Sequence, residues 1–128
     1  MKRTIAALSI VAALAALTAC SSDSSDDKPA AKAPAYTITH QDDSGNQRHV
    51  QVEVNSTDGL RAVFDDVSAK LTDDAGWFVE INCSSGGTAK ADNRLANGRK
   101  AVGRIGAAAT GLADGETEFQ VNDGATCP

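Results

Sequence analysis

The chain has 128 residues and a formal net charge of −5, which fits one small domain with a tail. The acidic excess argues against nucleic acid and anionic lipid head groups as partners, because both need clustered positive charge. Aromatic residues make up 4% of the chain, too few for an extended stacking platform once the core has taken its share.

The first 20 residues have the layout of a secretory signal. Lys2 and Arg3 form a short cationic start, residues 5–17 are apolar apart from Ser9, and small residues precede Cys20. The sequence LTAC at 17–20 resembles the lipobox of bacterial lipoproteins, in which the cysteine receives a diacylglycerol thioether and the signal is cut off in front of it. The resemblance implies a lipoprotein signal peptide over residues 1–19 and a mature chain that begins at lipidated Cys20.

A single transmembrane anchor and ordinary secretion are the alternatives for this stretch. A spanning helix needs about 20 apolar residues, and the run that ends at Ala19 is shorter and contains Ser9 and Thr18. We therefore favour an extracytoplasmic protein that reaches the cell membrane through lipid on Cys20. Loss of Lys2 and Arg3 with the signal changes the net charge from −5 to −7.

Residues 20–35 have the composition of a disordered tether. They read CSSDSSDDKPAAKAPA and contain two of the three prolines of the chain. Such a segment has no apolar side chain large enough to build a core, and its serines and prolines give a flexible, partly extended spacer. We expect this lipidated tether to hold a single domain, residues 36–128, away from the membrane.

The domain begins with a predicted β-hairpin. Residues 36–40 and 48–54 alternate between apolar and polar side chains on either side of a turn-rich stretch, and the valines at 50, 52 and 54 share one face. Residues 60–71 then carry apolar side chains at helical spacing, after cap candidates at 55–58. A third strand is predicted over 77–82, apolar enough to be central in a sheet.

Glycine and small side chains dominate from Ser84 onward. Asn97-Gly98 is a strong turn signal and predicts a hairpin of residues 91–96 and 99–104. A helical interpretation competes, but each interior glycine would cost it about 1 kcal/mol. Residues 106–112 are expected to form a loop or a single helical turn, and residues 116–121 a last strand.

Together these elements predict an α+β domain with the order ββαβ(ββ)β. The short connections favour an antiparallel sheet of about five to six strands with one main helix packed across it.

One disulfide is expected. With Cys20 assigned to lipid, only Cys83 and Cys127 remain, in a compartment that permits oxidation. A bridge that closes a loop of about 45 residues would stabilise the fold by roughly 4 kcal/mol in the chain-entropy model. The alternative, a free or metal-bound thiol pair, lacks the close spacing and the nearby histidines of zinc sites.

Catalytic chemistry has little support in the sequence. The best metal-site candidate is His40 and His49 beside Asp42 or Asp43 in the first hairpin, and two solvent-facing histidines are the favoured alternative. The spacing from Gly98 to Gly103 fits a phosphate loop, but Arg104 and Ile105 stand where Lys and Ser or Thr are needed. We predict no catalytic residue, no metal, no cofactor and no enzyme.

Basic residues concentrate late in the chain. Five of the eight cations in residues 36–128 fall in one stretch and form a candidate patch for an anionic partner, either an acidic wall polymer or an envelope protein. They are Lys90, Arg94, Arg99, Lys100 and Arg104. The alternative, which we favour, is that they balance neighbouring carboxylates on a solvated hairpin.

Several motifs resemble small lipoproteins of high-GC Gram-positive bacteria. They are the lipobox, the tether, INCSSGGTAKADNRLANGRKAVG at 81–103, GAAATGL at 106–112, GETEF at 115–119 and the terminal TCP. The resemblance covers most of residues 36–128. It supports the extracytoplasmic location and the pairing of Cys83 with Cys127, and it implies no activity.

Three functional hypotheses follow. The first is a lipid-anchored extracytoplasmic binding or interaction module whose ligand the sequence does not identify. The second is a small inhibitor of an extracellular hydrolase that presents residues 84–89 or the Asn97 turn. The third is a hydrolase that uses His40 or His49.

Overall fold

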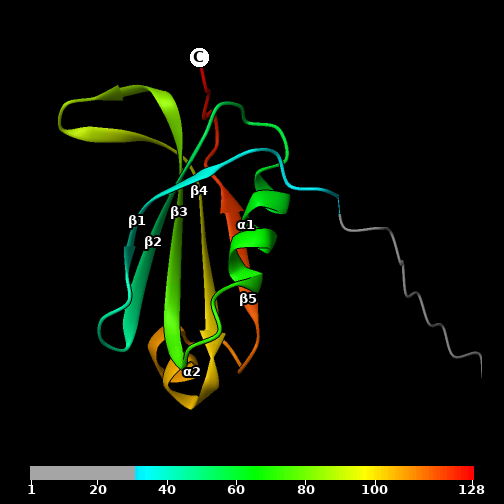
Figure 1. Cartoon of the computed structure of the whole chain (residues 1–128), viewed down its shortest axis with the longest axis vertical. Coiled ribbons are helices and arrows are strands. Elements are labelled where there is room, and N and C mark those ends of the chain that lie inside the picture. Colours follow the sequence, from blue (N-terminus) through cyan, green and yellow to red (C-terminus); the bar gives the residue numbers. More distant parts are fainter. Residues whose placement is uncertain (1–30) are drawn as a thin grey trace, which may run out of the picture.

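The structure is a computed structural model that describes residues 31–128. These residues form an α+β domain with a five-stranded mixed sheet in the order β1-β2-β3-β4-β5, and two helices (Figure 1). The elements are β1 (Thr37–Asp42), β2 (Gln47–Val54), α1 (Leu60–Ala69), β3 (Ala75–Thr88), β4 (Ala91–Val102), α2 (Gly103–Thr110) and β5 (Thr117–Val121). The predicted signal peptide and Cys20 lie outside the described residues.

The predicted first hairpin is confirmed. β1 and β2 pair antiparallel, and the three valines of β2 at 50, 52 and 54 are buried as expected. Every residue of β1 is exposed, since this strand forms one edge of the sheet. The hairpin therefore contributes to the core through β2 alone.

The predicted all-antiparallel sheet is wrong at its centre. β2 and β3 pair parallel, with Val50 opposite Val79 and Val54 opposite Cys83. The cause is α1, which carries the chain from the end of β2 back to the start of β3; a crossover of this kind joins parallel neighbours. The helix predicted over 60–71 is observed as α1, ending two residues earlier at Ala69.

The core lies between α1 and one face of the sheet. α1 buries an apolar stripe that includes Phe64, and β3 contributes Trp77, whose indole Nε1 donates to the carbonyl of Asp73 at 3.1 Å. Lys100, from β4, also lies on this face and donates to the carbonyls of Ser68 and Leu71 at 2.7 and 3.0 Å. This cation therefore adds a second donor to the Ser68 carbonyl, which also accepts from the Leu71 backbone N–H at 3.2 Å, and bonds the Leu71 carbonyl just beyond the end of α1.

The predicted hairpin around Asn97-Gly98 is wrong, because β4 runs through both residues as one strand. Gly98 is paired with Val79 in the sheet. A Cβ at Gly98 would lie 2.1 Å from Cε2 of Phe64, so the glycine provides space for an aromatic ring of α1. The glycine of the Asn97-Gly98 pair is therefore explained by close packing against Phe64, and no turn forms at these residues.

The predicted strand over 99–104 ends at Val102, and residues 103–110 form the helix α2 in place of a loop. α2 lies on the face opposite α1, at one end of the sheet, where Ala109 and Thr110 cover Gly76. A Cβ at Gly106 would lie 2.4 Å from the carbonyl oxygen of Ala75. The missing side chain at Gly106 therefore lets the helix approach the strand closely.

The remaining predictions concern the two ends of the domain. The last strand is confirmed as β5, and the disulfide between Cys83 and Cys127 is confirmed, joining residues 44 apart in sequence. Ala33 packs against the core and Pro34 lies beside Gly59, so residues 33–36, called the lead segment below, belong to the folded part. Neither helix in residues 31–128 has the length and apolarity needed to cross a membrane.

Candidate functional site

The most distinctive surface feature is a two-stranded extension of β3 and β4, residues 84–92, called the arm (Figure 1). The pairing of β2 with β3 stops at Cys83, and the pairing of β5 with β4 stops at Ala96. Beyond those points β3 and β4 continue outward together. Every residue of the arm is exposed, so it adds nothing to the apolar core.

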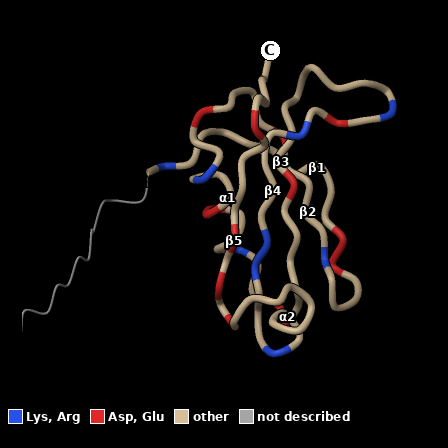
Figure 2. The backbone as a smooth tube through the Cα atoms, turned by 180° about the vertical axis from the view of Figure 1, so that it is seen from behind, with Lys and Arg blue, Asp and Glu red and all other residues tan. Residues whose placement is uncertain are grey.

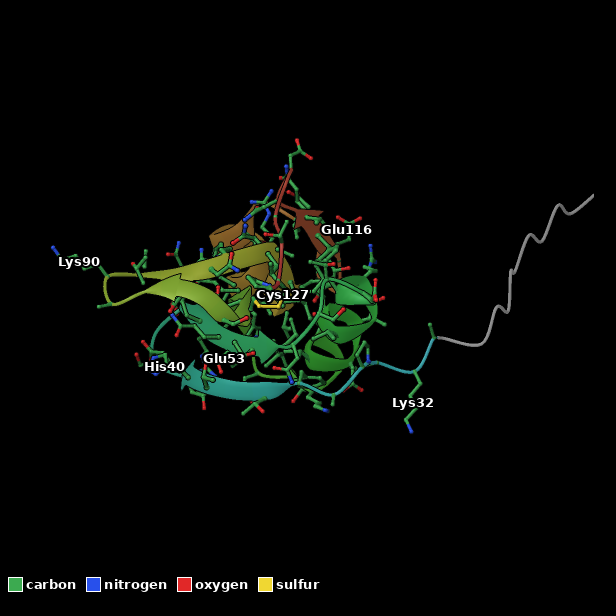
Figure 3. All side chains as sticks on the ribbon, turned by 90° about the horizontal axis from the view of Figure 1, so that it is seen from above. Lys32, His40, Glu53, Lys90, Glu116 and Cys127 are labelled. Carbon is green, nitrogen blue, oxygen red and sulfur yellow. A yellow bond between two sulfur atoms is a disulfide. The ribbon has the colours of Figure 1, made fainter. Side chains whose placement is uncertain are left out.

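The tip of the arm is a two-residue turn, Ala89-Lys90, closed by the pairing of Thr88 with Ala91. The hydroxyl Oγ1 of Thr88 accepts hydrogen bonds from the backbone N–H of Lys90 at 3.3 Å and of Ala91 at 3.1 Å. Side chains of this type stabilise turns by bonding to nearby backbone groups. Lys90 projects from the outermost part of the domain (Figure 3).

The base of the arm is held by the C-terminal tail. Cys83 is bridged to Cys127, and the side-chain nitrogen of Asn93 donates to the carbonyls of Ser85 at 3.0 Å and Thr126 at 2.8 Å. The hydroxyl of Ser85 donates to the carbonyl of Pro128 at 2.7 Å. The tail therefore clamps the arm where it leaves the sheet.

The contacts between the arm and the C-terminal tail stabilise a ribbon that lacks a buried face. A two-stranded ribbon is at best marginally stable when it buries no apolar face. Here a covalent bridge and three side-chain hydrogen bonds replace burial at the base. The arm is consequently held at its base by contacts within the domain, and an element held in this way loses little conformational entropy if it binds.

The five cations of the predicted patch are spread over the arm, β4 and α2, and Figure 2 shows the backbone positions of the Lys and Arg residues. Lys90 is at the arm tip, and Arg104 is on α2. Arg94 and Arg99 lie on the sheet face opposite α1 and form ion pairs with Glu80 at 2.5 Å and Glu118 at 2.7 Å. Lys100, on the α1 face, is bonded to the helix carbonyls described above.

Of these five cations, only Lys90 and Arg104 have no acidic partner and no carbonyl contact within residues 31–128. The other three cations, Arg94, Arg99 and Lys100, are bonded to carboxylates or carbonyls of the domain itself.

The two histidines lie on neighbouring strands. His49 is opposite Asp42 in the β1–β2 register, and the ring of His49 stacks on Phe78 with centroids 5.4 Å apart. Hydrogen bonds from the Ser44 hydroxyl and backbone N–H lower the pKa of Asp42 below its usual 3.8, and the nearby His40 and His49 add to this. In the described part of the chain, no group of three or more side chains is arranged to hold a metal ion.

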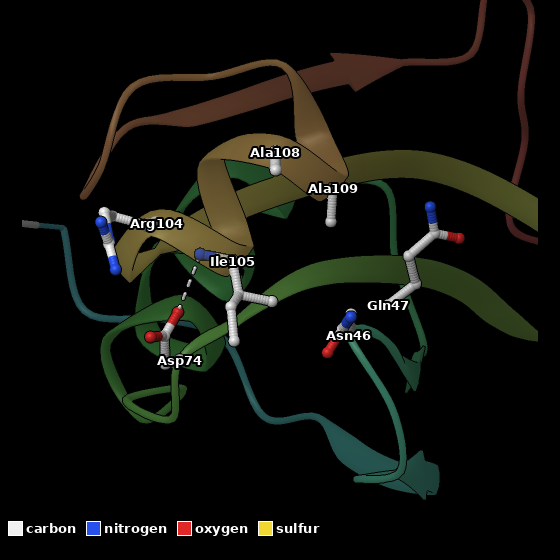
Figure 4. A pocket seen from close by; sticks show the side chains of 7 residues that line it. All are labelled: Asn46, Gln47, Asp74, Arg104, Ile105, Ala108 and Ala109. Atoms are coloured by element: carbon white, nitrogen blue, oxygen red, sulfur yellow. Dashed lines mark hydrogen bonds between the residues drawn. The ribbon is translucent and has the colours of Figure 1, made fainter.

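A shallow groove of about 640 Å³ lies between the β1–β2 turn and α2 (Figure 4). Asp74 lies beside Ile105 in the wall of this groove and accepts a hydrogen bond from the Ile105 backbone N–H at 3.2 Å. This carboxylate is therefore occupied in capping the N-terminal turn of α2. Arg104, Asn46 and Gln47 complete its polar rim, and all three are exposed, so the groove provides no buried group that would select a ligand.

Comparison with known proteins gives no functional assignment. No protein-family model, no curated protein and no solved structure matches this chain.

Proposed function

We propose that this protein is an extracytoplasmic binding module, held at the cell membrane by lipid on Cys20, and that it contacts its partner through the arm. The observation that supports this is the combination of complete exposure and bracing in residues 84–92. A ribbon that buries nothing does not stabilise the domain, so an ordered ribbon of this kind is better explained by contacts outside it.

A protein partner is better supported than an anionic wall polymer. Binding to a polyanion needs several unpaired cations on one surface, and Arg94 and Arg99 are already paired with Glu80 and Glu118. The arm itself carries small side chains and a single cation, Lys90. Such a surface is suited to contact through shape and main-chain groups, as in the addition of strands between proteins.

The lead segment supports a short tether. Ala33 and Tyr36 pack against the core, and the Tyr36 hydroxyl donates to Asp66 at 2.5 Å. The tether can therefore extend only over residues 20–32. Fully stretched, that length reaches at most about 45 Å, so a lipid on Cys20 would keep the arm close to the membrane and to other envelope proteins.

A hydrolase that uses His40 or His49 has weaker support. The sheet places His49 next to Asp42, but Ser44 already donates to that carboxylate. Among residues 31–128, neither imidazole is hydrogen bonded to a serine or cysteine side chain that could act as a nucleophile.

Photocrosslinking in intact cells tests the proposed contact surface. A photoreactive amino acid at Ala89, in the arm, should give a covalent adduct of one defined mass. The same residue at Ala108, which is exposed on α2, is the matched control and should not give that adduct. Equal labelling from both positions, or no adduct from Ala89, would contradict the assignment.

The anchor is tested separately by feeding cells a labelled fatty acid. Label should appear on the full chain and disappear in Cys20→Ala. A chain that stays unlabelled, or a variant that keeps its label, would remove the membrane-held part of the proposal. The Ala89 crosslink tests the arm whichever way the labelling turns out.

A further inference from the structure

Lys90 is the only charged residue from residue 84 to residue 91. It is exposed at the tip, and no carboxylate within residues 31–128 pairs with it. Arginines of the sheet are placed differently, since Arg94 and Arg99 are both neutralised by ion pairs. The domain thus presents one free ammonium group on a projecting support (Figure 3).

The support is narrow. Apart from Lys90, the side chains of residues 84–91 are those of Ser, Gly, Thr and Ala. A ribbon with such small side chains can enter a cleft that would exclude a loop with bulky residues. In residues 84–91, Lys90 is the only side chain long enough to fill a pocket on a partner.

The tip is also ordered on both sides of the lysine. Thr88 fixes the backbone N–H groups of Lys90 and Ala91, and the pairing of Thr88 with Ala91 closes the turn. Further down, the Cys83–Cys127 bridge and Asn93 hold the two strands to the tail. An ordered loop binds an enzyme cleft at low entropy cost.

From these features we propose that the arm is an inhibitory hairpin for an extracellular serine protease that prefers basic residues, with the Lys90 side chain at its turn inserted in the specificity pocket. Such a pocket has a carboxylate at its base, which would supply the missing partner for the ammonium group. The inference rests on the arm being the contact surface, and it adds the class of partner and the anchoring residue.

The test uses the oxidised full-length chain in detergent and trypsin as the probe protease. We expect competitive inhibition of trypsin, with little inhibition of chymotrypsin. Lys90→Ala should weaken the inhibition by at least about tenfold, which corresponds to about 1.4 kcal/mol of binding free energy. Lys90→Arg should retain it, because both side chains carry the charge that the pocket recognises.

Lys32→Ala is the control, because Lys32 is an exposed lysine at the end of the tether, on the side of the molecule away from Lys90 (Figure 3). It should leave inhibition unchanged. Circular dichroism melting curves should coincide for all variants, since neither lysine contributes to the core.

Three results would overturn the inference: no inhibition of trypsin, equal loss of inhibition in Lys90→Ala and Lys32→Ala, or rapid cleavage after Lys90 without inhibition. None of them would remove the arm as a contact surface, because the in-cell crosslink from Ala89 is measured independently. Loss of that crosslink together with intact trypsin inhibition would instead contradict the proposed contact with an envelope partner in the cell, while the protease-directed inference would stand on the inhibition data.

Discussion

The two halves of the β3–β4 pair show how differently one ribbon can be kept in order. In the inner half, Trp77, Val79 and Ile81 are at most 2% exposed and pack under α1. In the outer half, the arm, every residue is exposed. The inner half is ordered by burial of apolar surface, whereas the outer half is ordered by a bridge and hydrogen bonds at its base. Packing therefore constrains the inner sequence, whereas under the proposed function it is contact with a partner that constrains the outer one.

Removal of the disulfide should have the largest effect on this comparison. Cys83→Ala with Cys127→Ala opens a loop whose ends are 44 residues apart. The chain-entropy model predicts a loss of about 4 kcal/mol in the free energy of unfolding, measurable by urea denaturation. Native-state amide exchange should also accelerate more in the arm than in the inner half.

The matched control for that experiment is chemical reduction of the unmodified chain, which should reproduce the double variant. If the arm amides remained as protected as before, bracing by the tail would not be what orders the outer half.

Two glycine substitutions compare how tightly the inner half and the arm are packed. Gly98→Ala places a Cβ about where the Phe64 ring lies, 2.1 Å from Cε2, and overpacking of this kind typically costs about 1–3 kcal/mol. Gly87→Ala, in the arm, would place a Cβ 3.2 Å from the carbonyl oxygen of Ala91 and 3.3 Å from the backbone nitrogen of Asn93, which is tight but about 1 Å less severe than at Gly98. It should lower the free energy of unfolding by less than Gly98→Ala does.

Thermal unfolding of both variants measures this difference. Equal destabilisation by Gly87→Ala and Gly98→Ala would mean that the arm is packed as tightly as the core, contrary to its exposure.

A smaller and more local effect is expected at the clamp. Asn93→Ala removes two hydrogen bonds, to Ser85 and to Thr126, from a partly exposed site. The net loss should be about 1 kcal/mol, seen as roughly fivefold faster exchange of arm amides. Asn46→Ala, an exposed asparagine in the β1–β2 turn, is the control and should leave arm exchange unchanged.

The smallest effect concerns the lead segment, which, like the arm, is held by polar contacts. A hydrogen bond from the Tyr36 hydroxyl, with a second from Lys70, lowers the pKa of Asp66 below its usual 3.8. The same hydroxyl and Asp66 raise the pKa of Lys70 to about 12. In Tyr36→Phe the pKa of Asp66 should move back up toward 3.8, as measured by NMR titration.

The pH dependence of this contact follows from the two shifts. The contribution of Asp66 is complete above pH 3.8 and is lost as the pH falls through its lowered folded-state pKa. The contribution of Lys70 is complete below pH 10.5 and is lost as the pH rises through about 12. An unchanged Asp66 titration in Tyr36→Phe would show that the hydroxyl does not stabilise the carboxylate.

Much of the fold could be predicted from residue patterns, because the first hairpin, α1 and the inner half of β3 have clear apolar periodicity. The parallel pairing of β2 and β3 was missed because connection length was weighed above the crossover that a helix between two strands implies. Gly98 misled for a different reason. This glycine makes room for the ring of Phe64, which is distant in sequence, and local turn rules do not include that contact. The close approach of Gly106 to Ala75, which α2 requires, likewise has no local sequence pattern.

The candidate site was predicted less well. Residues 84–89 were one of two suggested inhibitor loops, and the other, at Asn97, is part of a continuous strand. The available signal was the run of small polar residues between Cys83 and Asn93, with no apolar periodicity to place it in the core. The clamp from Asn93 to Thr126 joins residues 33 apart and has no sequence pattern of its own.

Under the proposed function, the parallel β2–β3 pair would also determine how the domain carries mechanical tension between its lipid attachment and a bound partner. Thr37 is opposite Glu53, and Glu53 is opposite Asn82, so the point where the chain enters the sheet and the root of the arm are separated by a single strand. A pull between the two therefore runs across one end of the sheet and leaves α2 and the β1–β2 turn unloaded. The covalent bond at Cys83 stands where that force would reach the arm.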